Sequence, residues 1–329
     1  MTVDSLLADL TRSGLSESLA RQTVAAAIAA GEVKGGDAPI ELPSGVREFA
    51  LGEAVTIAAA MDQSRVRIDD LVAALAGSER AERSNIYHHH YPAALARCGL
   101  ESIDLIEKFP VLTGNFAYTR GGSTPGTGDL RPFRLGANYA VYADLAETEA
   151  LFVRLKASRV ATWLRAEGFS IEDCGDERTA RLAILRAVEI PAPGQEVDSP
   201  TSGSRVLTLV HSLAHRFIRR AAVFAGIDRN ALAEMVVPHH LGFFIYAASR
   251  GDFVLGGLQA VFETELHHLL REVSSGDQRC ALDPGCMRAG GACMACLHLG
   301  EPSCRYYNRF LDRSTLFGKN GFLWSDLAH

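Results

Sequence analysis

The 329-residue sequence contains no run of about 18 apolar residues, the length that a membrane-spanning helix needs. Its N-terminus, Met1-Thr-Val-Asp-Ser5, lacks the basic flank and apolar core of a secretory signal. We therefore expect a cytoplasmic protein with no membrane segment. Clustered cysteines in that reducing compartment are more often metal ligands than disulfides.

Motifs of the common enzyme classes are missing as well. The sequence has no Gly-Lys-Ser/Thr phosphate loop and no helicase acidic box, which argues against ATP hydrolysis. It has no nucleophile elbow, and Ser212 stands between His211 and His215 where a zinc protease needs glutamate. The sequence therefore predicts a protein that is not an enzyme and offers no identifiable small-molecule substrate.

Basic charge is also scarce, with 33 Lys and Arg against 39 Asp and Glu and a net charge of −6. Any contact with DNA must then come from a local basic patch rather than from the overall charge. Arg216, Arg219 and Arg220 form a small basic edge, which we interpret as a solvated helix face. The hydrophobic content of 47% is ample for a packed core, and the length suits about two domains.

Cysteine, rare elsewhere, is concentrated near the C-terminus. Five of the seven cysteines lie between residues 280 and 304: Cys280, Cys286, Cys293, Cys296 and Cys304. Cys293 and Cys296 form a C-x2-C turn, a spacing that lets two thiolates reach one ion, and Zn²⁺ is the usual occupant. We predict one closed, structural zinc site built from four of the five thiols. Cys98 and Cys174 are interpreted as ordinary core or surface thiols.

The hydrophobic pattern predicts an α+β, helix-rich fold. We expect a helical N-terminal region (1–80), a mixed central α/β region (81–195) and a C-terminal strand–turn–helix domain (205–329) closed by the four-cysteine zinc site. The Pro-, Gly- and Ser-rich stretch 191–204 is the expected linker. Helices are expected, among other places, at 3–10, 15–30, 44–61, 68–75, 102–109, 148–168, 178–188, 206–226 and 258–273, and a buried strand at 241–249.

The histidines support a second hypothesis. His211 and His215 lie four residues apart on one helix face, and core or interface packing is the preferred interpretation. The consecutive histidines 88–90 are interpreted as surface or interdomain residues. The alternative is a metal-dependent nuclease or hydrolase that uses His211, His215, His239 and His240, although no carboxylate cluster accompanies them.

The C-terminal third resembles the MrfA-like zinc-binding domain, found at the end of MrfA-type helicases and in DrmB-like proteins of the DISARM antiphage system. The matching stretches are 211–215, Phe244-Ile-Tyr246, Gly256-Gly257-Leu258, Cys280, Asp283-Pro284, Cys286, Ala292-Cys293, Cys296-Leu297, Glu301, Ser303-Cys304, Asn308 and Leu311-Asp312-Arg313. Weaker likenesses extend upstream to about residue 100.

The resemblance implies a non-catalytic zinc subunit that associates with a helicase of the DrmA type and helps it to bind DNA. It assigns the ligands Cys293, Cys296 and Cys304. Cys286 is the favoured fourth ligand, with Cys280 as the alternative. A scaffold that never contacts DNA stays open as a further hypothesis.

Overall fold

The computed structural model describes residues 3–29, 42–62, 64–75, 80–122, 128–192, 195–248, 256–275, 279–300 and 303–323. It has an α+β fold, and the expected fold class is confirmed. None of the described helices is long and apolar enough to span a bilayer.

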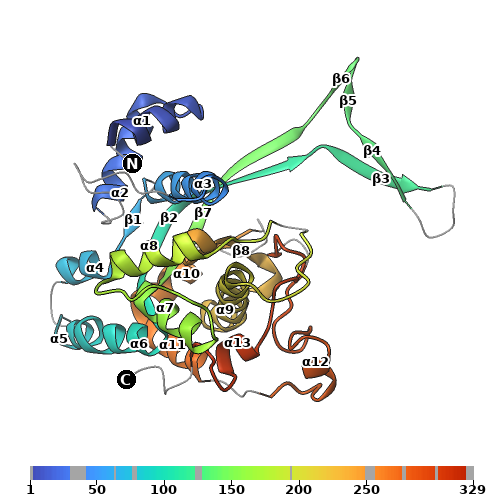
Figure 1. Cartoon of the computed structure of the whole chain (residues 1–329). Helices are drawn as coiled ribbons and strands as arrows, with labels where there is room; N and C mark the ends of the chain where they lie inside the picture. Colours follow the sequence, from blue (N-terminus) through green and yellow to red (C-terminus); the bar gives the residue numbers. More distant parts are fainter. Residues whose placement is uncertain are drawn as a thin grey trace.

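One antiparallel sheet organises the body (Figure 1). Its five strands lie in the order β1 (Arg65–Val66), β2 (Leu100–Asn115), β7 (Tyr142–Leu155), β9 (Gly242–Ala247) and β8 (Leu232–Val237). β7 pairs with β9 through registers such as Phe152 opposite Phe244. The expected regions 81–195 and 205–329 therefore share one sheet, and the stretch 191–204 leads directly into the next helix.

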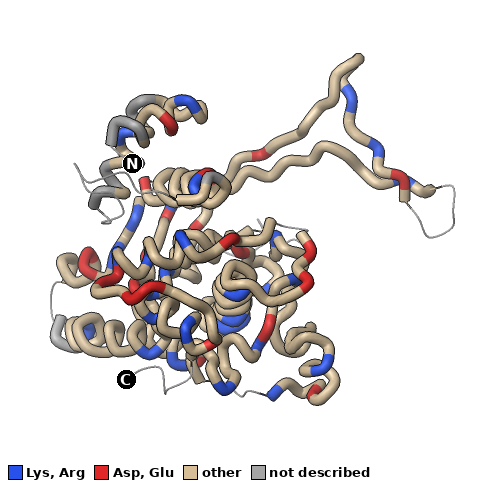
Figure 2. Tube along the Cα trace, in the orientation of Figure 1, with Lys and Arg blue, Asp and Glu red and all other residues tan. Residues whose placement is uncertain are grey.

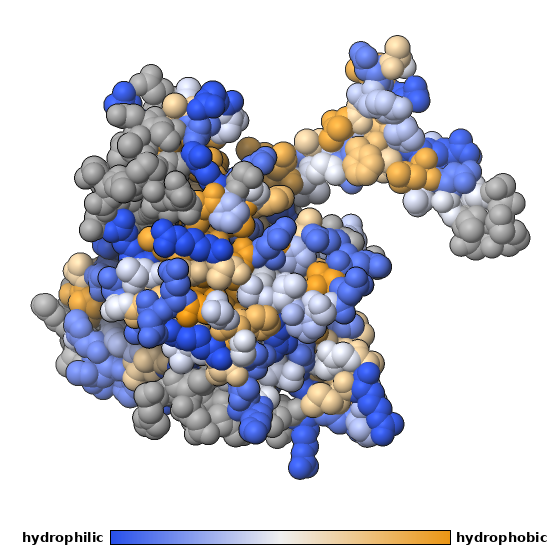
Figure 3. All heavy atoms as spheres, viewed as in Figure 1, coloured by the Kyte–Doolittle hydropathy of each residue, from blue (hydrophilic) through white to orange (hydrophobic). Residues whose placement is uncertain are grey.

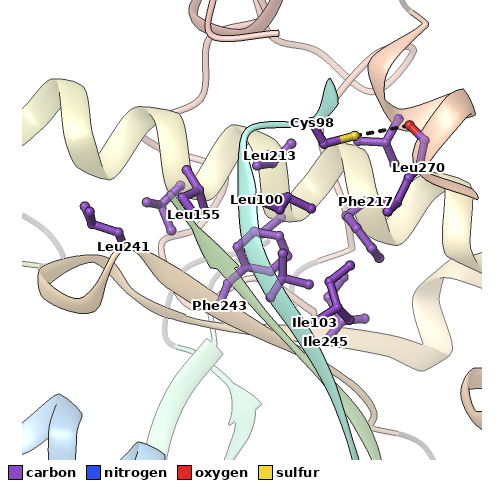
Figure 4. Close-up of a cluster of buried hydrophobic side chains, with 14 of the residues drawn as sticks. Cys98, Leu100, Ile103, Leu155, Leu213, Phe217, Leu241, Phe243, Ile245 and Leu270 are labelled. Atoms are coloured by element: carbon purple, nitrogen blue, oxygen red, sulfur yellow. Dashed lines mark hydrogen bonds between the residues drawn. The ribbon is translucent and has the colours of Figure 1, made fainter. Parts of the chain in front are cut away.

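The central helix α9 (Ser202–Ala225) packs against this sheet. Its N-cap Thr201 accepts a hydrogen bond from the Ser204 amide, and Gly226 ends it with a left-handed φ of 66°. Apolar side chains of α9 such as Leu213 and Phe217 meet Phe243 and Ile245 of the sheet (Figure 4). α9 is covered by the sheet and by neighbouring helices, so it lies at the centre of the core.

Further helices complete the body. They are α5 (Arg80–Asn85), the π-helix η1 (Ile86–His90), α6 (Tyr91–Arg97), α7 (Ala157–Ala166), α8 (Glu177–Ala187), α10 (Gly257–Ala260), the π-helix η4 (Val261–Glu265), α11 (Leu266–Ser274), α12 (Gly285–Arg288) and α13 (Ser314–Phe317). Two short 3-10 helices, η2 (Arg229–Ala231) and η3 (Pro238–His240), flank β8. Cys98 is a buried core thiol that donates to the Leu270 carbonyl at 3.3 Å, drawn as a dashed line in Figure 4.

The described part of the N-terminal region holds four helices, α1 (Val3–Arg12), α2 (Glu17–Ala29), α3 (Ser44–Met61) and α4 (Ile68–Ala74), together with β1. α3 docks on η3 through polar contacts. Glu53 on α3 accepts a hydrogen bond from the His239 amide at 2.9 Å and lies 2.6 Å from His239 Nδ1, while His240 Nε2 lies 2.8 Å from the Ala50 carbonyl. His239 and His240 thus attach the N-terminal helices to the body.

An arm leaves the body where β2 and β7 run on together beyond the sheet (Figure 1). It carries the small strands β3 (Ala117–Gly121), β4 (Gly128–Pro132), β5 (Arg134–Leu135) and β6 (Asn138–Tyr139). Many of its apolar side chains are exposed (Figure 3): Leu112, Phe116, Tyr118, Leu130, Leu135, Tyr139, Val141, Tyr142 and Leu145.

Two helix predictions were wrong. Residues 102–109 lie in β2, and residues 148–155 lie in β7, so that the expected helix 148–168 is confined to α7. Both strands lie inside the sheet and carry uninterrupted buried runs, Ile103 to Ile106 and Ala150 to Val153. Strands buried on both faces lose the polar–apolar alternation that separates a strand from a helix in a sequence.

Candidate metal centre

Four cysteines converge at one point: Cys280, Cys286, Cys293 and Cys296. Cys286 belongs to α12, which lies at the edge of the body (Figure 1). Their sulfur atoms all lie within 4.8 Å of one another. The Sγ–Sγ distances are 3.5 Å for Cys280–Cys293 and 3.7 Å for both Cys286–Cys296 and Cys293–Cys296. A tetrahedral zinc with Zn–S bonds of about 2.3 Å places its sulfurs about 3.8 Å apart. This set, the thiolate group, therefore fits a Zn²⁺ ion.

Backbone turns position the thiols. The Cys293–Cys296 turn is closed by the Cys296 amide donating to the Cys293 carbonyl at 3.0 Å. Gly291, whose φ is +77°, donates to the Cys286 carbonyl at 2.9 Å, and an added Cβ there would lie 2.5 Å from Asp312 Oδ1. Glycine is thus the residue that this left-handed, crowded turn accommodates.

Asp283 fixes the start of the thiolate group. Its carboxylate accepts the Cys280 amide at 2.7 Å and pairs with the Arg313 guanidinium at 2.9 and 3.0 Å. These hydrogen bonds and the Arg313 charge lower the pKa of Asp283, so the pair stays ionised. Arg313 lies in the Leu311-Asp312-Arg313 stretch, which explains how that stretch supports the cysteines.

The thiols of this group differ in pKa. Burial alone would raise the pKa of Cys293, but hydrogen bonds from the Ala295 amide and contacts with Cys280 and Cys286 lower it to about 7. Burial raises the pKa of Cys286, and the neighbouring thiols Cys293 and Cys296 raise it further. One thiolate is thus favoured near neutral pH, and a divalent cation is the natural partner for the remaining thiols, because metal binding displaces their protons. All seven cysteines are free of disulfides.

The structure groups the cysteines differently from the expected ligand set. Cys286, Cys293 and Cys296 come together with Cys280, the residue expected as the alternative, whereas Cys304 lies elsewhere. Its sulfur is 3.2 Å from His211 Nε2, in a buried set with His215 and Glu234 that we call the mixed group. Leu297 and Leu299, which follow Cys296, are buried, and Cys304 is buried beside His211 of α9.

The remaining histidines do not line one open site. His211 and His215 are fully buried, while His239 and His240 contact α3. The side chains of residues 88–90 on η1 are exposed. The four histidines of the nuclease hypothesis thus lie in two separate parts of the structure and do not form one site. Glu234, the carboxylate beside His211, was missed from the sequence, where its one signal is a lone acid in the apolar strand Leu232–Val237.

An arginine-lined cleft of about 310 Å³ adjoins the thiolate group. We define the arginine cleft by Arg216, Arg219, Arg220, Arg279 and Arg313, which lie around Cys280 and Cys296. The basic edge of α9 therefore faces a cleft and not only open solvent; the blue positions on α9 are visible in Figure 2.

The arginines of this cleft have unequal surroundings. Arg219 donates to the Met294, Ala295 and His298 carbonyls and, with Arg313, lies in the field of the thiols. Burial, and then the charge of Arg220, lower the pKa of Arg216 to about 10. These cations repel one another, and a bound anion would relieve that repulsion. The arginine cleft therefore favours anion binding.

No family model matches the sequence. A similar protein is the DISARM protein DrmB of Bacillus paralicheniformis, which is 26% identical over 181 aligned residues. The alignment covers 51% of this chain and 31% of that protein, so the chain spans about a third of its relative's length. Over about half of its own length, the chain is thus similar to a DrmB protein of the DISARM system.

Proposed function

We propose that this chain is a non-catalytic, zinc-binding subunit that works with a DNA helicase in antiphage defence of the DISARM type. The similarity to DrmB supports the defence role. The thiolate group supports the zinc, because its four sulfurs form a closed set that leaves no open coordination position for a reaction. The likeness to the zinc-binding domain of MrfA-type helicases and the missing motor motifs favour a helicase partner of the DrmA type.

The arginine cleft supports the DNA part of this proposal. The positive charges of Arg219 and Arg313 are compensated locally, because both guanidinium groups lie near the cysteine thiolates. Arg220 and Arg279 have no hydrogen-bond or ion-pair partner among the residues that the structure describes. Guanidinium groups that present free donors recognise phosphate oxygens in pairs. Zinc would hold one wall of the cleft, Cys280 to Leu297, against α9.

A salt titration tests this interface. We expect the wild-type chain to bind labelled DNA with an affinity that falls steeply with salt, and Arg220→Glu/Arg279→Glu to reduce the logarithmic slope by about 2. Arg186→Glu is the matched control, because Arg186 lies on α8 and pairs with Glu172 at 3.8 Å. An unchanged slope in the double variant would remove the arginine cleft from the interface. Absence of binding at low salt would leave the scaffold hypothesis.

The helicase partner is tested separately by co-purification. The untagged neighbours of the gene are expressed with a tagged copy of this chain, and a helicase is expected in the eluate. Retention of that helicase by Arg220→Glu/Arg279→Glu would separate protein association from DNA contact. Recovery of this chain alone, under conditions in which the helicase is soluble, would contradict the proposed partnership.

A further inference from the structure

The mixed group lies where three distant parts of the chain meet. His211 and His215 come from α9, Glu234 from β8, and Cys304 from the segment that follows the thiolate group. The exposed fractions of these four residues are 0, 0, 1 and 3%. Burying four ionisable side chains away from water costs free energy unless the side chains are paired or coordinate a metal.

Hydrogen bonds inside the protein leave this group incomplete. His211 and Glu234 could form an ion pair, since Nε2 and Oε1 are 3.5 Å apart. That pair still leaves His215 Nε2 and Glu234 Oε2 buried, and neither atom has a hydrogen-bond partner within the part of the chain that the structure describes. An unsatisfied buried polar atom costs about 1–3 kcal/mol, so two such atoms at one point call for a missing partner.

Both imidazoles are oriented as metal ligands are. His211 Nδ1 lies 3.2 Å from the Phe310 carbonyl and His215 Nδ1 lies 2.9 Å from the Leu297 carbonyl. A carbonyl can only accept, so each Nδ1 carries the proton, and the Nε2 atoms face the centre of the group. An outer backbone carbonyl that fixes the tautomer in this way is a recurrent feature of metal-bound histidines.

We propose that His211, His215, Glu234 and Cys304 bind a second metal ion, Zn²⁺, in a closed structural site. Their donor atoms all lie within 4.8 Å of one another, with His211 Nε2 at 3.2 Å from Cys304 Sγ and 3.5 Å from Glu234 Oε1. Tetrahedral zinc with bonds of about 2.0–2.3 Å separates neighbouring donors by about 3.3–3.8 Å. The two anions balance the charge of the ion, and a thiolate with two imidazoles selects zinc over magnesium or calcium.

Backbone groups of residues 297–300 and 303–310 surround this ion. Besides the two carbonyls, the Arg305 amide donates to Glu234 Oε1 and the Asn308 amide donates to Cys304 Sγ, both at 3.2 Å. Every ligand is thus held by one backbone group of these residues. The second ion joins α9 and β8 to the residues that follow the thiolate group. It would also stabilise the wall of the arginine cleft, because Leu297 lines that cleft and its carbonyl contacts the ligand His215.

Metal content and X-ray absorption test the second site on the full-length, untagged chain. We expect two zinc ions per chain. Five sulfur ligands shared between two ions give an average of 2.5 sulfurs per zinc, whereas the thiolate group alone gives four. His215→Gln and Cys304→Ser are each expected to lower the content to one zinc and to raise the sulfur average to four. Cys98→Ser, a buried cysteine outside both groups, should keep two ions.

The wild-type measurement decides the proposal even if the variants fail to fold. One zinc per chain with four sulfur ligands would overturn it. One zinc per chain with about one sulfur ligand would support the mixed group and reject the thiolate group instead. Two ions that both persist in His215→Gln and Cys304→Ser would also overturn it, because the ion must lose a ligand in each.

Discussion

The thiolate group and the mixed group differ in how the chain builds them. The thiolate group comes from one short stretch, residues 280–296, and lies at the edge of the body. Two of its members, Cys293 and Cys296, are half-buried. The mixed group joins residues 93 positions apart and lies entirely within the core. Local turns therefore suffice for the first, whereas the second forms only when the sheet, α9 and the C-terminal segment have packed.

The largest expected effect follows from removing one thiolate ligand. Structural zinc sites contribute about 10 kcal/mol or more of apparent folding free energy, comparable to the whole stability of a domain. Cys293→Ser should therefore yield protein whose C-terminal segment is unfolded, detected by zinc content and circular dichroism. Cys174→Ser, at a partly exposed thiol outside both groups, should behave as wild type. Normal melting without zinc would contradict a structural role.

Zinc release to a chelator distinguishes the two groups in the intact protein. The half-exposed thiolates give a chelator direct access, whereas the mixed group must open first. We expect two phases of equal amplitude in a colorimetric assay, the slower one following the unfolding rate across a urea series. Two phases that are both independent of urea would contradict burial as the cause of the difference.

Asn308 tests the backbone that surrounds the mixed group. Its side chain pairs with both the amide and the carbonyl of Leu299 at 2.9 Å, and its φ is +57°. Asn308→Gly keeps the left-handed backbone but removes both hydrogen bonds, so the free energy of unfolding should fall by about 1–3 kcal/mol. Tyr307→Gly, at a neighbouring left-handed residue with an exposed side chain, should be neutral or stabilising in the same urea titration.

The smallest effect is expected at Asp283, which supports the thiolate group alone. Asp283→Asn keeps the size of the side chain but weakens the pairing with Arg313 and the acceptor for the Cys280 amide. The fast phase of zinc release should accelerate while the slow phase stays constant. Acceleration of both phases would show that the two groups exchange zinc through one common opening.

The helices were largely predictable because their signals are local. α9 carries an apolar face and a terminal Gly226, and both are readable in the sequence. Residues 102–109 of β2 and 148–155 of β7 were mistaken for helices because their buried runs have no alternation. The two segments are identified as strands by their pairing with each other and with β1 and β9.

The site divides in the same way. By itself, the sequence determined that thiols cluster between residues 280 and 304 and that a C-x2-C turn, with a spacing typical of zinc ligands, begins at Cys293, since spacing within a turn is a local property. Only the tertiary structure decided that Cys280 completes this set and that Cys304 joins His211, His215 and Glu234. The reason is physical: burial of Leu297 and Leu299 against the core sets the direction of the chain, and spacing along the sequence carries no record of that packing.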